Sequence, residues 1–203
     1  MGLQQLRFIF CGIMVMTISQ NISLGLTIGE AIDVTAARLE KNQTNKGNWP
    51  GEEDYTGSIV AGMVSAYERT CDPDYRTSAE KGGDYILKFG YGSGDELFAL
   101  KRLSEISVDP CDNEWRTAAG IFFNHVKYDY EGGTDAYIDD LPGSFEPSTA
   151  VFYIANYAVS AYYFDAEDKQ LWRNKLIEYL AEVDNGVAWY PVMGLGIATW
   201  TLA

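Results

Sequence analysis

Carboxylate and aromatic side chains gather in four connecting segments of the chain. The segments read KGNWPGEEDYTG, FGYGSGDE, YDYEGGTDAYIDDLPGSFEPS and NGVAWYP, at residues 46–57, 89–96, 128–148 and 185–191. An aromatic ring stacks on the C–H face of a sugar, and carboxylates accept hydrogen bonds from sugar hydroxyls. Two carboxylates can also cleave a glycosidic bond, one as acid and one as base or nucleophile. The residue types therefore predict a carbohydrate site, with glycoside hydrolysis as the chemistry if a bond is broken.

The catalytic candidates are four acids: Glu53, Asp54, Asp139 and Glu146. Asp140, next to Asp139, is a further candidate on the same loop. The predicted substrate-binding residues are aromatic: Trp49, Tyr55, Tyr91, Tyr137, Trp189 and Tyr190. A structural role competes with the catalytic one, because Asp54, Asp95 and Ser148 precede or open predicted helices. At such positions a side-chain oxygen or a negative charge caps the helix.

Metal binding is a second chemistry to consider. GEED and DAYIDD cluster the hard oxygen ligands that calcium prefers, but EF-hand spacing is absent and acids scattered on a solvated loop are the ordinary explanation, so we expect no cofactor, with calcium as the alternative. We expect no zinc site, because His125 is the only histidine and Cys111 lies a helix length before it. Nucleophilic hydrolysis is not expected either, since the chain has no G-x-S-x-G sequence.

The charge of the chain excludes several partners. Its formal net charge is −14 and its isoelectric point is near 4.3. Such a field repels phosphate backbones and anionic headgroups, so nucleic acid and acidic membranes are not expected partners. An acidic glycan is disfavoured for the same reason, and with it a polysaccharide lyase, which needs cations near the uronate.

The first 25 residues are typical of a secretory signal peptide. Arg7 precedes an apolar run from Phe8 to Ile18, and Ser23-Leu24-Gly25 is a cleavage site of the small-x-small kind. The run is too short to span a bilayer, which takes about 20 apolar residues. We predict a secreted protein, extracellular or periplasmic, without membrane association after cleavage; a buried N-terminal helix is the alternative.

The remaining residues, 26–203, read as one helical domain. Apolar residues recur at helical spacing in segments of two kinds, and no strand pattern is present. Some segments, such as STAVFYIANYAVSAYY, are apolar nearly all round, which suits buried inner helices. Others, such as DKQLWRNKLIEYLAEV, are amphipathic and charged, which suits an outer layer. The predicted helices cover these residues: 29–42, 57–69, 74–88, 95–106, 113–127, 148–164, 167–183 and an eighth from about 190.

The outer segments form an internal repeat. Tyr75-Arg76, Trp115-Arg116 and Trp172-Arg173 each follow a short turn that contains Asp or Pro. Such periods indicate stacked helical hairpins. Cys71 and Cys111 occupy comparable turns of neighbouring hairpins, so in an oxidising compartment we predict a disulfide between them. Two separate buried thiols are the alternative.

One stretch carries a family resemblance. LEKNQTNKGNW has the spacing L-x3-Q-x3-G-x-W, which resembles the QW motif of the terpene cyclase and protein prenyltransferase superfamily of α/α toroids. The resemblance implies that Gln43 bonds to backbone groups, Gly47 permits a turn and Trp49 stacks. The alternating helix pairs extend this resemblance to most of the chain after the leader. The chain is also similar to uncharacterised secreted bacterial proteins of this superfamily, and that likeness implies a fold but no activity.

We therefore predict an all-α fold, an (α/α) toroid or partial toroid of helical hairpins with inner and outer layers. The family's toroids have five to seven hairpins, and this chain ends inside an apolar inner helix without stop signals. We expect a domain that is incomplete at the C-terminus, or an open arc whose last helix is covered by another protomer.

Three functions remain in order of preference. The first is a secreted carbohydrate-active or carbohydrate-binding protein that uses an aromatic, acidic rim for a neutral glycan. The second is an extracellular structural or protein-interaction scaffold without catalysis. The third is a cyclase-like enzyme acting on isoprenoids, which the leader peptide and the missing D-x-D-D acid sequence both oppose.

Overall fold

The chain folds into helices joined by turns. The computed structural model describes residues 27–51, 55–91, 94–142, 146–183 and 191–203, which contain no strand. The elements are α2 (Ile28–Asn42), α3 (Thr56–Thr70), α4 (Pro73–Phe89), α5 (Asp95–Ile106), α6 (Glu114–Asn124), the π-helix η2 (His125–Asp129), α7 (Gly133–Asp139), α8 (Pro147–Tyr163), α9 (Lys169–Glu182) and α10 (Pro191–Leu202). The all-α prediction is confirmed. The predicted leader lies outside the described residues.

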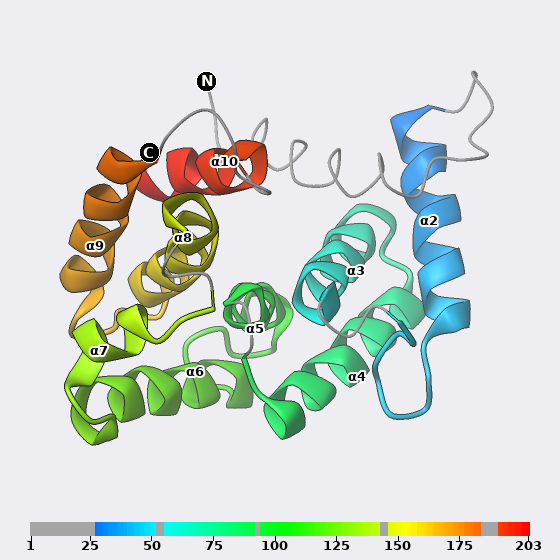
Figure 1. The fold of residues 1–203 in the computed structure, drawn as a ribbon. Helices are drawn as coiled ribbons and strands as arrows, with labels where there is room; N and C mark the ends of the chain where they lie inside the picture. The colour runs from blue at the N-terminus through cyan, green and yellow to red at the C-terminus, as the bar shows by residue number, and fades with distance from the viewer. Residues whose placement is uncertain (1–26, 52–54, 92–93, 143–145, 184–190) are drawn as a thin grey trace.

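The helices form two layers (Figure 1). α3, α5 and α8 lie side by side on the inside, and α2, α4, α6 and α9 follow one another around them. α10 continues the inner row beyond α8, against which it packs. The described helices thus lie in two rows, and whether these rows are part of a toroid stays a prediction.

The inner helices run in the same direction. Ser58 near the start of α3 bonds to Asp95 at the start of α5, while Glu68 near the end of α3 bonds to Arg102 farther along α5. A Cβ on Gly194 of α10 would lie 2.9 Å from the carbonyl oxygen of Ser148, at the start of α8. The outer helices lead the chain back between successive inner helices.

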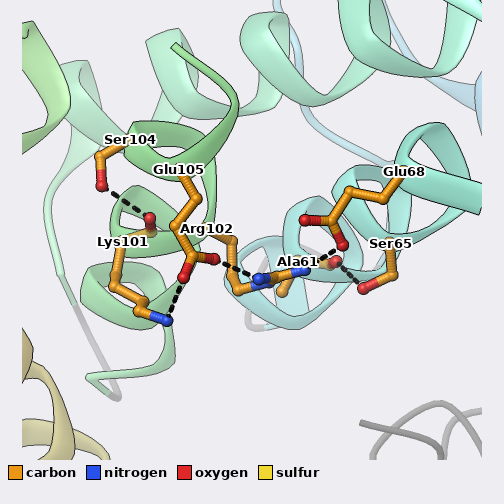
Figure 2. Close-up of polar contacts among 7 residues, drawn as sticks. All are labelled: Ala61, Ser65, Glu68, Lys101, Arg102, Ser104 and Glu105. Atoms are coloured by element: carbon orange, nitrogen blue, oxygen red, sulfur yellow. Dashed lines mark hydrogen bonds and ion pairs between the residues drawn. The ribbon is translucent and has the colours of Figure 1, made fainter. Parts of the chain in front are cut away.

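Arg102 joins α3 to α5 (Figure 2). Its Nη2 donates to Glu68 Oε2 at 2.6 Å, and its Nη1 donates to Glu105 on its own helix. Lys101 Nζ donates to the other carboxylate oxygen of Glu105 at 2.6 Å. The Arg102 side chain is nearly buried, so its charge is balanced by carboxylates from both inner helices.

Three of the outer helices, α4, α6 and α9, bury a large aromatic residue at the repeated position. Tyr75, Trp115 and Trp172 are all buried. The arginines that follow them are half-buried or exposed. The repeated position is thus a buried packing position in these three helices.

The loop after α2 is closed by Gln43. Its Nε2 donates to the carbonyl oxygens of Gly47 at 2.9 Å and Ser78 at 2.8 Å, and its Oε1 accepts from Ser78 Oγ. Trp49 Nε1 donates to the Leu39 carbonyl oxygen at 2.7 Å. Gly47 has a φ of +96°, and a Cβ there would lie 2.0 Å from the Lys81 carbonyl oxygen. The contacts that the resemblance implies for Gln43 and Gly47 are confirmed.

Replacing Gly47 tests the close contact of this loop with α4. Gly51 serves as the matched control, because its φ is +78° and a Cβ there would meet no described atom within 4 Å. Gly51→Ala should lower the free energy of unfolding by about 1 kcal/mol, the cost of a left-handed residue. Gly47→Ala should cost about 2 kcal/mol more, since the added methyl group meets backbone atoms. Urea unfolding measures both, and equal losses would contradict the packing described.

Candidate functional site

The predicted site residues divide into three groups. Glu53, Asp54, Trp189 and Tyr190 lie outside the described residues. Trp49 is only 2% exposed, so its ring is part of the packing between α2 and α4 and presents no surface to a ligand. The rest lie at the end where the inner helices begin: Tyr55, Tyr91, Tyr137, Asp139, Asp140 and Glu146.

Tyr157 brings two of the predicted residues together. Its hydroxyl donates to the Tyr91 carbonyl oxygen at 2.7 Å and accepts from the Tyr137 hydroxyl at 3.3 Å. The Tyr137 and Tyr157 rings meet edge to face, with centroids 5.8 Å apart. Phe122 stacks on Tyr157 and also contacts Tyr91. We call Tyr91, Phe122, Tyr137 and Tyr157 the tyrosine cluster.

Burial sets the ionisation of this cluster. It raises the pKa of Tyr91 and of Tyr137 above the ordinary value, because the charged phenolate loses its hydration. It raises the pKa of Tyr157 much further, and the negative charge of Glu96 adds to the effect on Tyr137 and Tyr157. The Tyr137 and Tyr157 hydroxyls each donate a hydrogen bond within the cluster, which needs their protonated form.

Two acids lie beside the tyrosine cluster at the start of α5. Asp95 is 6% exposed, and its Oδ2 accepts from Ser58 N at 2.8 Å and from Ser58 Oγ at 2.9 Å. Glu96 is 7% exposed, and its Oε2 accepts from Gly94 N at 3.0 Å. Asp95 caps a helix, as its position predicts, but the helix is the neighbouring α3 rather than its own. Both carboxylates hold backbone at the junction of the inner helices.

The catalytic candidates of the third segment are exposed and bonded to hydroxyl groups. Tyr130 donates to Asp140 Oδ2 at 2.6 Å, which raises the pKa of the Tyr130 phenol. The Tyr179 hydroxyl lies 3.5 Å from Asp139 Oδ1. Glu146, just before α8, accepts from Thr149 at 3.4 Å. These carboxylates can accept hydrogen bonds from a ligand, and Tyr130 connects them to the tyrosine cluster through the ring of Tyr137.

Sequence reasoning missed the centre of this arrangement. Tyr157 lies in a strongly apolar inner helix, where an aromatic residue is expected to belong to the core. The available signal was its neighbour Asn156, which is also buried. Two adjacent buried polar side chains in a mostly apolar helix require partners, and those of Tyr157 are the Tyr91 carbonyl oxygen and the Tyr137 hydroxyl.

Metal ligands do not converge in the described part of the chain. No group of three or more His, Cys, Asp or Glu side chains is placed there to hold an ion. Asp135 of the DAYIDD segment pairs instead with Lys175 at 3.1 Å. Calcium binding stays a prediction.

The predicted disulfide is not formed. Cys71 and Cys111 are free and exposed. Cys71 ends α3 in a left-handed conformation, with φ 58°, and the backbone N–H of Cys111 donates to Asp109 Oδ1 in the connection after α5. Each thiol is held by its own turn, since comparable places in neighbouring hairpins do not require a short distance between the sulfur atoms.

Comparisons of the chain with protein-family models, with curated proteins and with solved structures gave no match. The resemblance to the α/α-toroid superfamily stays a prediction from the sequence. Among the described helices, none is both long and apolar enough to cross a membrane.

Asp95→Asn tests the junction between α3 and α5. It removes the charge that accepts two hydrogen bonds from Ser58, and charge-assisted bonds stabilise more than neutral ones. We expect the free energy of unfolding to fall by about 2 kcal/mol. Asp112→Asn, the same change at an exposed loop position, should leave it within about 0.5 kcal/mol. Equal effects in urea unfolding would refute the capping role.

The raised pKa of Tyr157 predicts a loss of stability in alkali. The stabilisation from its protonated hydroxyl is fully present below pH 10, the usual pKa in the unfolded chain, and is lost as the pH rises through the folded value. Tyr157→Phe should therefore be less stable at neutral pH by about 1 kcal/mol, with the difference shrinking above pH 10. Unfolding measured across this range, with tyrosinate absorbance, checks it. Tyr162→Phe, at an exposed position, is the control.

Proposed function

We propose that the protein binds a neutral glycan at the end of the fold where the inner helices begin. The observation that carries the proposal is the tyrosine cluster and its extension to the surface through Tyr130 and Asp140. Tyr130 and Tyr137 are half-buried, and their rings meet edge to face, which offers an apolar surface to the C–H face of a sugar, while the fully buried Tyr157 holds Tyr137 from behind. The exposed carboxylates of Asp139, Asp140 and Glu146 supply acceptors for sugar hydroxyl groups, and Asp140 is joined to the cluster through Tyr130.

We also propose that the two helical layers are an arc of an α/α toroid. The proposal is supported by the common direction of the inner helices and by the Gln43 contacts that tie the α2 loop to α4. In such an arc the long connections lie on one end of a rigid scaffold, which is where binding residues are commonly found. The predicted secretion of the protein would give the site access to extracellular polysaccharide.

The second candidate is a scaffold that binds another protein and performs no chemistry. Asp95 and Glu96 favour it, since both buried acids are already bonded to backbone groups of the fold. A catalytic acid or base needs instead to face its substrate. For this reason we propose glycan binding as the function and leave bond cleavage as an outcome of the test.

The test is binding of the secreted domain to neutral and acidic polysaccharides, with assays for released reducing and unsaturated ends. Tyr55→Ala and Tyr130→Ala should each weaken binding of a neutral glycan about 10-fold, the loss of one stacking partner. Tyr162→Ala is the matched control, because Tyr162 is 67% exposed against 52% for Tyr55 but lies at the other end of the inner layer.

Each assay is repeated with calcium and with a chelator, which tests the calcium prediction through ligand-linked stability. No binding to any polysaccharide by the folded protein would favour the scaffold. An equal loss in all three tyrosine variants would place the site elsewhere. Binding with release of sugar ends would assign an enzyme and direct mutagenesis to Asp139 and Glu146.

A further inference from the structure

The segment Asn42-Gln43-Thr44 has the sequence of an acceptor for N-linked glycan, Asn-X-Ser/Thr with X other than proline. Only one other asparagine of the chain is in such a sequence, Asn21, and it belongs to the predicted leader. Glu40, two residues before Asn42, adds the carboxylate that the longer, acidic form of this acceptor sequence carries. In a secreted chain this pattern indicates a modified surface loop.

The fold presents Asn42 at its surface. Asn42 is the last residue of α2, it is exposed, and its side chain bonds to none of the residues that the structure describes. Gln43 is extended, with φ −68° and ψ 135°, so the chain leaves the helix directly after the acceptor. The Thr44 hydroxyl donates to Asn48 Oδ1 at 2.6 Å. A glycan on Asn42 would therefore displace no contact of the fold.

The surface beside Asn42 suits a sugar. A shallow depression of about 200 Å³ lies between the end of α2 and the first half of α4. Its lining consists of hydroxyl, amide and charged side chains: Glu40, Gln43, Thr44, Asn45, Asp74, Thr77, Ser78 and Lys81. The residues on both sides of the acceptor in sequence thus contribute to a polar hollow in which hydroxyl groups find hydrogen-bond partners.

We propose that Asn42 carries an N-linked glycan. In the transfer, Asn42 Nδ2 bonds to C1 of the first sugar of a lipid-pyrophosphate-linked oligosaccharide. The bond from C1 to the pyrophosphate oxygen breaks, the lipid pyrophosphate leaves, and the amide loses one proton. No oxidant or reductant takes part. The proposal rests on the predicted secretion and is independent of glycan binding at the rim.

The order of events follows from Gln43. In the folded chain its side chain is fixed by the Gly47 and Ser78 carbonyl oxygens, so the acceptor sequence cannot adapt to an enzyme. Transfer therefore precedes closure of this loop, during or just after export. Once the loop has closed, the glycan stays on the outside, because Asn42 itself takes no part in the packing.

The test is expression of the full 203-residue chain in a secreting eukaryotic cell line, followed by intact mass and peptide mass spectrometry. The secreted wild type should carry a glycan that an N-glycan amidase removes, with conversion of Asn42 to Asp. Asn42→Gln should lose the glycan completely. Asn45→Gln, a neighbouring exposed asparagine outside any acceptor sequence, and Thr44→Ser, which preserves the sequence, should both retain it.

Three results would overturn the proposal. They are a secreted wild type with unmodified Asn42, a chain retained in the cell without glycan, and a glycan that persists in Asn42→Gln. Circular dichroism and melting temperature after amidase treatment must be equal in all variants, which separates loss of the acceptor from loss of the fold. Failure of polysaccharide binding at the rim would leave these results unchanged, because Tyr55 and Tyr130 take no part in the acceptor sequence.

Discussion

The close approach of α3 and α5 at Gly57 is the constraint on which the fold depends. A Cβ on Gly57 would lie 2.5 Å from Glu96 N and 2.6 Å from the carbonyl carbon of Asp95, so only glycine permits this contact. At the same place the Asp95 carboxylate caps α3. Both contacts require the two inner helices to begin at the same end. The chain must then return through an outer helix each time, and the two-layer arrangement follows.

This constraint also shapes the candidate site. The acids nearest the inner helix starts, Asp95 and Glu96, are occupied in holding backbone, which leaves ligand contacts to the connections. The tyrosine cluster lies between Asp95 and Glu96 on one side and the connection that contains Tyr130 on the other. Its hydroxyls bond to one another and to the Tyr91 carbonyl oxygen, while its rings lead outward to Tyr130. The acids that stabilise the fold, Asp95 and Glu96, are therefore different residues from the exposed acids that we propose as ligand contacts.

Helices and contacts that depend only on the spacing of nearby residues could be predicted from the sequence. Apolar periodicity predicted α3 and α5 to within about a residue, and the Gln43 to Trp49 spacing predicted a closed loop. α7 was missed because it is short and opens with Gly133, inside a segment whose turn residues indicate a loop. The predicted end of α6 at residue 127 includes part of η2, since periodicity does not separate an α-helix from a π-helix that continues it.

Where a role depends on distance between segments, sequence patterns were not sufficient. The repeat placed Cys71 and Cys111 in comparable turns but could not supply the separation of their sulfur atoms. It likewise could not show that Asp95 reaches across to Ser58, or that Tyr157 lies between Tyr91 and Tyr137. These contacts join residues that are 20 to 66 positions apart.

The common direction of α3, α5, α8 and α10 has an electrostatic consequence. Each inner-helix N-terminus carries about half a positive elementary charge, and the C-termini of the returning outer helices bring the opposite charge to the same end. At the start of α5 the buried carboxylates of Asp95 and Glu96 add to the negative side of this balance. At longer range the net charge of −14 sets the field of the molecule. An approaching anion is repelled at long range, whereas an uncharged, hydroxyl-rich molecule meets no such barrier.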